Sequence, residues 1–378
     1  MRKENPFTIK PIKEKEEFIG RKDLIDQVAD MLSTQQNCHV IGERKSGKTS
    51  FLYRMAEEFT ERGDTEFVFL DMQQLAPCES KEILGRIAHN VDINLPKREM
   101  GYGEFEDFID GKKVILAFDE ISALLKNEKI DSGFFDFLRA ISSNFDVVFL
   151  TTHREGLYEL VEKHTNVSSP FFNYFRNFHL GYFTKEESKE LIRKGGEEFL
   201  HYYEEWILDR AYYHPFLLQL TCLILFEYYK EKKEDKESIF SSIEEEAYKT
   251  LESHFRFWYN KSSEEEQRLL EKISRKEDIS TEEERFGNNL ERRLLIYRKN
   301  NRSHLVSPFF ERIIEEKIKK KEKEEKISKK EGKEKELPSL ISSLIEKIEK
   351  SWPYKIIIII SVILGALAAI LTLREIVQ

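Results

Sequence analysis

The chain has 378 residues, enough for two or three domains and a sizeable core, which excludes a small disulfide-stapled protein. Its three cysteines lack metal-site spacing and are expected to be reduced core thiols, so a zinc site is not expected. The formal net charge is −9, and residues 1–311 alone carry −13, because residues 312–355 carry +4 and the rest is neutral. An acidic main body makes nucleic acid a poor default partner.

The first half of the chain predicts an α/β core. Residues 1–17 form a charged N-terminal segment without an apolar run, so no signal peptide is predicted. In residues 18–183, almost wholly apolar segments alternate with segments of helical spacing, which is typical of a parallel sheet covered on both faces. The predicted strands are residues 38–41, 67–71, 114–119, 147–151 and 178–181.

The segments that follow are predicted to be mainly helical. Residues 184–240 form a helical lid, whose first helix begins at a capping box of Thr184 and Glu187. Residues 241–315 are helical and then end in the order helix, short strand, Asn-rich turn, short strand, helix, which predicts a winged helix. Residues 316–351 are predicted to be a charged linker followed by an amphipathic helix.

The C-terminus contains the one strongly apolar stretch. Residues 356–373 are 18 residues without a charge, and as a helix they would span about 27 Å, close to the hydrocarbon thickness of a bilayer. Trp352 and Tyr354 precede the stretch, where interfacial aromatic residues belong. A buried core helix is the alternative, but no nearby segment could cover it on all sides. We therefore predict a single-pass transmembrane helix over residues 352–374, with the N-terminal domains in the cytoplasm.

The sharpest motif is GERKSGKT, residues 42–49, which fits the pattern GxxxxGK[ST]. It stands between a predicted strand and a predicted helix, where backbone N–H groups can wrap phosphates and the helix N-terminus favours negative charge. Lys48 is predicted to reach the β- and γ-phosphates, and Thr49 to hold Mg²⁺. A plain glycine turn is the alternative. The predicted nucleotide contacts are Gly42, Glu43, Arg44, Lys45, Ser46, Gly47, Lys48, Thr49 and Ser50.

Two later strand ends carry polar residues suited to the same site. Asp119 follows an apolar run and is predicted to hold Mg²⁺ through water, while Glu120 polarises the water that attacks the nucleotide. Lys48 and Glu120 are thus the predicted catalytic residues. Thr152 directly follows the next predicted strand and is either a sensor of the γ-phosphate or a helix cap. Arg154 and Arg176 are candidate arginine fingers, although a surface ion pair is the favoured reading of each.

Residues 18–315 resemble the STAND class of AAA-like P-loop ATPases. FIGRKDLIDQVADML, residues 18–32, is similar to the FxGRxxEL entry of that class, which implies that Gly20 and Arg21 approach the adenine. AYYHPFLLQL, residues 211–220, resembles the helical module whose GxP turn contacts the nucleotide, which implies a role for Pro215. Tyr213 stands where that turn usually has glycine, which puts the detailed contact in doubt.

The resemblance implies a P-loop NTPase sheet, an all-α lid and a winged helix, with ATP and Mg²⁺ as cofactors. It also implies a slow ATPase that acts as a switch, with an ATP-dependent homo-oligomer and a signalling or defence output. One alternative is a DNA-binding ATPase of the replication-initiator type. It is disfavoured because residues 261–311 contain 11 basic and 11 acidic residues, whereas a DNA reader normally shows a basic face. A membrane-tethered protein-remodelling ATPase is the other alternative.

Overall fold

The computed structural model describes residues 4–130, 132–163, 170–230, 236–324, 342–343 and 361–366. The chain divides into two compact units, Met1–Ile314 and Glu315–Gln378. The sheets and the numbered helices below all belong to the first unit.

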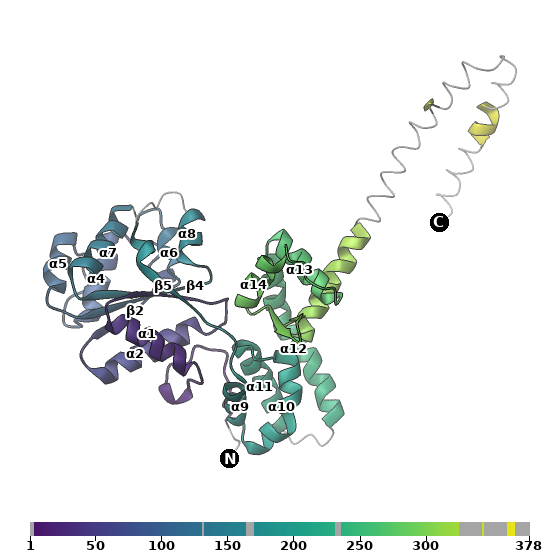
Figure 1. The fold of residues 1–378 in the computed structure, drawn as a ribbon, viewed down its shortest axis with the longest axis horizontal. Helices are drawn as coiled ribbons and strands as arrows, with labels where there is room; N and C mark the ends of the chain where they lie inside the picture. Colours follow the sequence, from purple (N-terminus) through teal and green to yellow (C-terminus); the bar gives the residue numbers. More distant parts are fainter. Residues whose placement is uncertain are drawn as a thin grey trace. The chain divides into compact units, whose positions relative to one another are not determined.

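A five-stranded sheet forms the centre of the α/β part (Figure 1). All its strand pairs are parallel, and the strand order is β2-β3-β4-β1-β5. This confirms the predicted α/β fold with a parallel sheet. Two of the three inner strands, β3 and β4, are buried along their whole length, as expected for strands covered on both faces. The strands are β1 (Asn37–Ile41), β2 (Glu66–Asp71), β3 (Val114–Asp119), β4 (Val147–His153) and β5 (Phe175–His179).

The fifth predicted strand, residues 178–181, is wrong by about three residues. Strand β5 begins at Phe175, which pairs with Asn37, and it ends at His179, which pairs with Ile41. Because β5 is an edge strand, it exposes Arg176 and Asn177, and the apolar pattern of a buried strand does not mark it. The prediction followed the more apolar residues after it instead.

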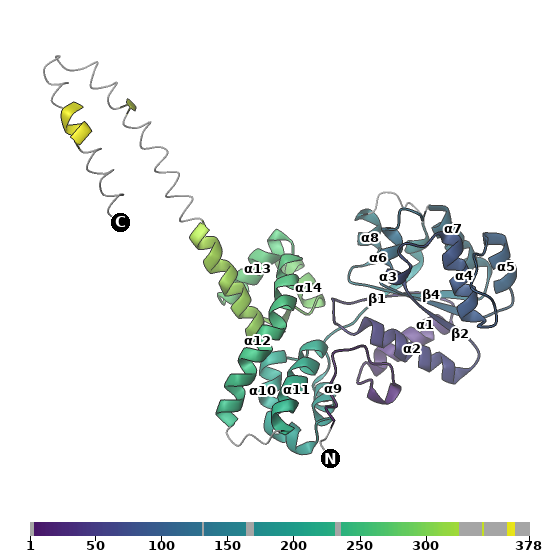
Figure 2. The ribbon, with the colours of Figure 1, turned by 180° about the vertical axis from the view of Figure 1, so that it is seen from behind.

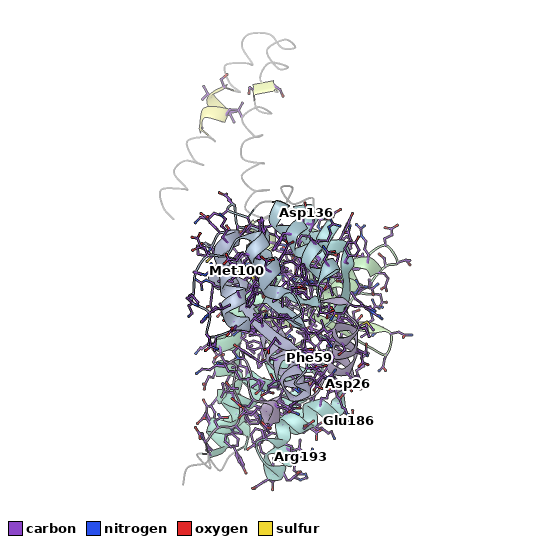
Figure 3. The ribbon with its side chains drawn as sticks, turned by 90° about the vertical axis from the view of Figure 1, so that its left-hand side faces the viewer. Asp26, Phe59, Met100, Asp136, Glu186 and Arg193 are labelled. Atoms are coloured by element: carbon purple, nitrogen blue, oxygen red, sulfur yellow. The ribbon has the colours of Figure 1, made fainter. Side chains whose placement is uncertain are left out.

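Helices cover both faces of the sheet (Figures 1 and 2). Alternate residues of β3 enter different cores: Ile115 packs in the layer of α1 and α2, and Leu116 in the opposite layer, because side chains alternate along a strand. Phe59 of α2 is buried, whereas Asp26 of α1 faces solvent (Figure 3). The first layer contains α1 (Lys22–Ser33) and α2 (Lys48–Arg62), and the second α3 (Met72–Leu75), α4 (Ser80–Val91), α5 (Tyr102–Ile109), α6 (Ser122–Leu125), α7 (Ser132–Asn144) and α8 (Leu157–Lys163).

Three helices follow as predicted for the lid: α9 (Lys185–Arg193), α10 (Glu197–Ala211) and α11 (Pro215–Lys230). The capping box at the start of α9 is confirmed, because the Thr184 hydroxyl accepts from the Glu187 N–H and the Glu187 carboxylate accepts from the Thr184 N–H. The N-terminal segment packs against this lid, although the sequence marked it only as charged. Phe7 is buried there, in contact with the rings of Phe199 and Phe226.

The end of the first unit has the element order predicted for a winged helix. An antiparallel hairpin follows the helices, and Asn300 and Asn301 form its turn with positive φ angles, which asparagine tolerates better than most residues. The predicted lid boundary at residue 240 falls inside α12. The elements are α12 (Lys236–Asn260), α13 (Glu264–Ser274), α14 (Glu284–Arg292), β6 (Ile296–Lys299) and β7 (Arg302–Leu305); two 3-10 turns, η1 (Lys15–Glu17) and η2 (Pro170–Tyr174), lie earlier in the chain.

The predicted linker and transmembrane helix fall mainly outside the described residues. Of residues 316–374, the structure describes 316–324, 342–343 and 361–366. Within the described parts of the chain, no helix is long and apolar enough to cross a membrane. The cysteine prediction is confirmed, because Cys38, Cys78 and Cys222 are buried free thiols.

Candidate functional site

The phosphate-loop motif, residues 42–49, connects the end of β1 to the start of α2. Gly47 caps α2 with a φ of 96°, in the left-handed region that favours glycine. A Cβ on Gly42 would overlap Ser46 Oγ and lie 3.2 Å from Leu180 Cβ. The backbone conformation therefore favours glycine at 47 and close packing favours glycine at 42, which supports the motif over a chance glycine turn.

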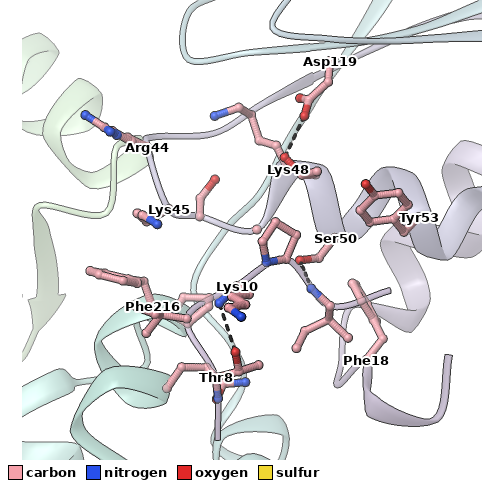
Figure 4. A pocket seen from close by; sticks show the side chains of 18 of the residues that line it. Thr8, Lys10, Phe18, Arg44, Lys45, Lys48, Ser50, Tyr53, Asp119 and Phe216 are labelled. Atoms are coloured by element: carbon pink, nitrogen blue, oxygen red, sulfur yellow. Dashed lines mark hydrogen bonds between the residues drawn. The ribbon is translucent and has the colours of Figure 1, made fainter. Parts of the chain in front are cut away.

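A cavity of about 550 Å³ opens beside this loop at the carboxyl ends of the strands (Figure 4). Its size lies in the range of small-molecule sites, and its position is the usual one for ligands of parallel α/β sheets. Of the residues predicted from the sequence, those that line the cavity are Arg21, Arg44, Lys45, Ser46, Gly47, Lys48, Thr49, Ser50, Asp119, Glu120 and Pro215.

Lys48 is buried at the inner end of the cavity. Its ammonium donates to the carbonyl oxygens of Gly42, at 3.0 Å, and Glu43, at 3.5 Å. It also lies 3.2 Å from Glu120 Oε1. Phosphate oxygens that enter the loop compete directly with Glu120 for this ammonium.

The two predicted metal ligands are in direct contact. The Thr49 hydroxyl donates to Asp119 Oδ2 at 2.7 Å, and the Thr152 hydroxyl donates to Asp119 Oδ1. Mg²⁺ takes hard oxygen ligands, and it usually keeps several waters besides one or two carboxylates. A hydroxyl and a carboxylate at the cavity wall fit that requirement. Thr152 is itself not in the lining, because its hydroxyl lies behind Asp119.

Glu120 has a defined orientation. Its backbone adopts a φ of 54°, and its N–H donates to Thr152 Oγ1 at 3.2 Å. Oε2 accepts from Nδ1 of His153 at 2.9 Å. Burial raises the pKa of Glu120, but the His153 hydrogen bond and the Lys48 charge outweigh burial and lower this pKa to about 2. Glu120 is therefore an anion at neutral pH, as a group that polarises water must be.

Glu43 of the loop points away from the cavity. Its Oε2 lies 2.8 Å from Nε of Arg293, and Nη1 of the same guanidinium lies 2.8 Å from Glu266 Oε2. Glu43 is 2% exposed and Glu266 4% exposed. Arg293 follows α14 directly, so one guanidinium, on a side chain that is 13% exposed, joins the phosphate loop to the α12–β7 part of the unit. Sequence reasoning missed this network, which we call the Arg293 bridge, because its members are far apart in the chain.

Arg21, directly before α1, makes hydrogen bonds to the phosphate loop and to the lid. Its guanidinium donates to the carbonyl oxygens of Ser46, at 3.0 Å, and Gly181, at 3.4 Å, and its backbone N–H donates to Glu187. Gly20 is close-packed, since a Cβ there would lie 2.6 Å from Glu187 Cδ. Burial lowers the pKa of Arg21 to about 10, partly offset by Glu187, so Arg21 remains a cation.

The turn before α11 holds Pro215 at the cavity wall. The left-handed residue in this turn is Tyr212, with a φ of 47°, rather than Tyr213. His214 is fully buried, and its Nδ1 accepts from the Phe216 N–H at 3.2 Å. Burial, followed by the charge of Arg21, lowers the pKa of His214 to about 3. A neutral imidazole therefore caps α11, and the turn forms without the glycine that the resemblance suggested.

Sequence reasoning also missed one wall of the cavity. The N-terminal segment crosses from the lid to α2, where the Thr8 N–H donates to Gln219 Oε1 and the Ile12 N–H donates to Ser50 Oγ. An irregular segment has no periodicity that would reveal such a role. The lining residues missed are Thr8, Ile9, Lys10, Pro11, Ile12, Glu17, Phe18, Ile19, Tyr53, Phe69, Asp71, Gln73, Gln74, Phe183, Leu191, Phe216 and Gln219.

The candidate arginine fingers lie elsewhere. Arg154 pairs with Glu155 at 3.0 Å, and Arg176 is exposed on the edge strand β5. Neither residue lines the cavity. Their role as fingers stays a prediction.

Comparisons with known proteins agree with this geometry. The family model of the Novel STAND NTPase 2 domain matches residues 109–278, and that of an AAA domain matches residues 30–161. A Walker-type ATPase of Pyrococcus abyssi superposes with a TM-score of 0.56 at 15% identity, over 82% of this chain and 99% of that one. The ORC2 protein of Aeropyrum pernix, in ADPNP–ADP complexes, superposes with a TM-score of 0.52 at 12% identity, over 80% and 94%. At such identities a likeness shows the fold alone.

No match is found among curated proteins. The two family models and the loop geometry support a P-loop NTPase domain of the STAND/AAA-like kind in this chain.

Proposed function

We propose that this chain is an ATP-binding and ATP-hydrolysing switch, in which the occupant of the P-loop controls the α12–β7 part of the unit. The observation that carries the proposal is the Arg293 bridge. This network connects the phosphate loop to a module far away in the chain, so a change at the loop can reach that module. Two buried carboxylates that share one guanidinium couple the two regions, because removal of the guanidinium leaves both negative charges uncompensated.

The residues divide the chemistry as follows. Lys48 exchanges its contact with Glu120 for the β- and γ-phosphates, while Thr49 and Asp119 hold the Mg²⁺ ion. When bound, Mg²⁺ offsets the negative charge on the phosphate oxygens. A water oxygen bonds to the γ-phosphorus, the bond to the bridging oxygen of ADP breaks, and Glu120 accepts a proton from the water. We expect hydrolysis to be slow, because the ion pair between Lys48 and Glu120 must separate before Glu120 can accept a proton from water.

The movement of Lys48 from Glu120 to the phosphates also affects the Arg293 bridge. Lys48 donates to the carbonyls of Gly42 and Glu43, and these contacts weaken when the ammonium turns to the phosphates. The side chain of Glu43 moves with its backbone, so its pair with Arg293 responds to the occupant of the loop. The STAND resemblance supports a signalling or defence output and a homo-oligomeric ATP state as finer proposals.

Replacing Arg293 with methionine tests the coupling. Glu43 and Glu266 then lose their shared cation, and we expect the free energy of unfolding to fall by about 3 kcal/mol. ADP should dissociate more slowly by at least roughly tenfold, because the bridge opposes binding of the phosphates in this proposal and 1.4 kcal/mol corresponds to a factor of ten. Denaturant unfolding and release of a fluorescent ADP measure the two effects. Arg292→Met is the matched control, because Arg292 is the exposed neighbour. Identical behaviour of the two variants would contradict the proposal.

We propose that the α12–β7 part is a structural winged helix rather than a DNA reader. Arg298 of its hairpin is neutralised by α14 itself, with Nη2 2.7 Å from Glu284 Oε2 and Nε 3.3 Å from Glu291 Oε2. A helix that presents carboxylates beside its basic partner repels phosphates. Filter binding to duplex DNA at low and moderate salt tests this, and salt-sensitive binding would favour the replication-initiator alternative.

We also propose that residues 352–374 anchor the protein in a membrane, with the N-terminal domains in the cytoplasm. The support is the uncharged stretch 356–373 and its preceding aromatic residues. The full-length protein is expected in the membrane pellet after a carbonate wash, and removal of residues 352–378 should release a soluble ATPase. Recovery of the full-length protein in the carbonate supernatant would show that the anchor is wrong.

A further inference from the structure

His153 has no role in the mechanism proposed above, although its side chain contacts Glu120. It is the last residue of β4. Phe118 of β3 pairs with Thr151 of β4, so His153 and Glu120, the residue directly after β3, lie close together. Its carbonyl accepts from the Gly42 N–H at 3.0 Å, so its backbone is attached to the first residue of the phosphate loop. Its side chain is 10% exposed.

The contacts of Glu120 show what this placement does. A carboxylate can only accept, so Nδ1 of His153 carries the proton in its 2.9 Å hydrogen bond to Oε2. The other oxygen, Oε1, faces Lys48. The end of β4 therefore makes two hydrogen bonds to Glu120: the Thr152 hydroxyl accepts from the Glu120 N–H, and His153 donates to the Glu120 carboxylate.

We infer that His153 is a positioning residue that aims Glu120 at the attacking water. The inference rests on the proposed ATPase function and deepens it. When the phosphates draw Lys48 away, Oε1 becomes free to accept the proton of the water, and the His153 bond to Oε2 keeps the carboxylate from rotating. His153 itself does not line the cavity, so it acts through Glu120 and not by contact with the nucleotide.

Two substitutions separate this role from a structural one. His153→Asn keeps an N–H donor at nearly the same distance from the backbone, whereas His153→Leu keeps the bulk and removes the donor. We expect His153→Leu to lower kcat at least about tenfold, which is part of the roughly 100- to 10,000-fold that a general base contributes, with KM for ATP changed less than about twofold. His153→Asn should recover most of kcat. Thermal unfolding and ATP titration of both variants show whether the fold and the nucleotide site are intact.

The Glu120→Gln background gives the decisive comparison. If His153 acts through Glu120, then adding His153→Leu leaves the residual rate of Glu120→Gln unchanged, because the group to be aimed is already absent. A wild-type kcat in His153→Leu overturns the inference, as does an equal fall in rate in both backgrounds. A wild-type rate in Glu120→Gln overturns the proposed function itself, so the two failures are distinguishable.

Discussion

Alanine at position 48 is expected to abolish ATP binding while leaving the fold intact. The Lys48 ammonium is buried beside the cavity with two carbonyl contacts and one carboxylate, and it is the cation placed to meet the phosphates. Two charge-assisted hydrogen bonds of about 1.5–3 kcal/mol each correspond to a loss of at least roughly 100-fold in affinity. Calorimetric titration with Mg-ATP measures this loss.

The control for this substitution is Lys81→Ala, which removes an exposed lysine from α4. Its binding isotherm should match that of the wild type. Thermal unfolding of Lys48→Ala shows whether the loss is local, because Glu120 keeps its hydrogen bond to His153. Wild-type ATP affinity in a folded Lys48→Ala protein would remove the P-loop assignment.

Glu120→Gln is expected to bind ATP with nearly the affinity of the wild type but to hydrolyse it at least about 100-fold more slowly. The amide keeps the size of the side chain, and its oxygen can still accept from His153. It cannot take a proton from water at neutral pH, whereas Glu120 is an anion, because the His153 hydrogen bond and the Lys48 charge outweigh burial and lower its pKa to about 2. Single-turnover hydrolysis and ATP titration separate the two effects.

This variant should also accumulate the ATP state. If ATP favours the self-associating state, Glu120→Gln forms larger oligomers with ATP, while Lys48→Ala does not. A ligand shifts an equilibrium only by its differential affinity for the two states. Particle mass in detergent, with and without ATP, gives the answer. Equal masses for both variants and the wild type under all conditions would favour a constitutive ATPase.

The sequence predicted those residues of the site that lie close to one another in the chain. The phosphate loop and the acidic strand end each combine chemistry and local structure within a few residues, so Lys48, Thr49, Asp119 and Glu120 could be named before any fold was known. The structure brings these four together. Parallel strands place their carboxyl ends at one edge, which makes such convergence predictable.

The residues that were missed depend on tertiary contacts. Arg293 reaches Glu43 across 250 residues, and nothing in an arginine after a helix indicates its partner. His153 could have been found from the register of β3 and β4, had the predicted strand not ended at residue 151. Residues 8–12, which form one wall of the cavity, carry no sequence pattern that indicates this role. Their position depends on the packing of Phe7 against Phe199 and Phe226 of the lid.

Amide hydrogen exchange of residues 284–306 tests the central claim most directly, because these residues carry Arg293 and its surroundings. We expect saturating Mg-ATP to accelerate exchange there in full-length Glu120→Gln, as Glu43 releases Arg293, and to leave Lys48→Ala unchanged. Exchange that is identical with and without ATP in Glu120→Gln, while calorimetry shows ATP bound, would contradict a switch that runs from the phosphate loop through Arg293.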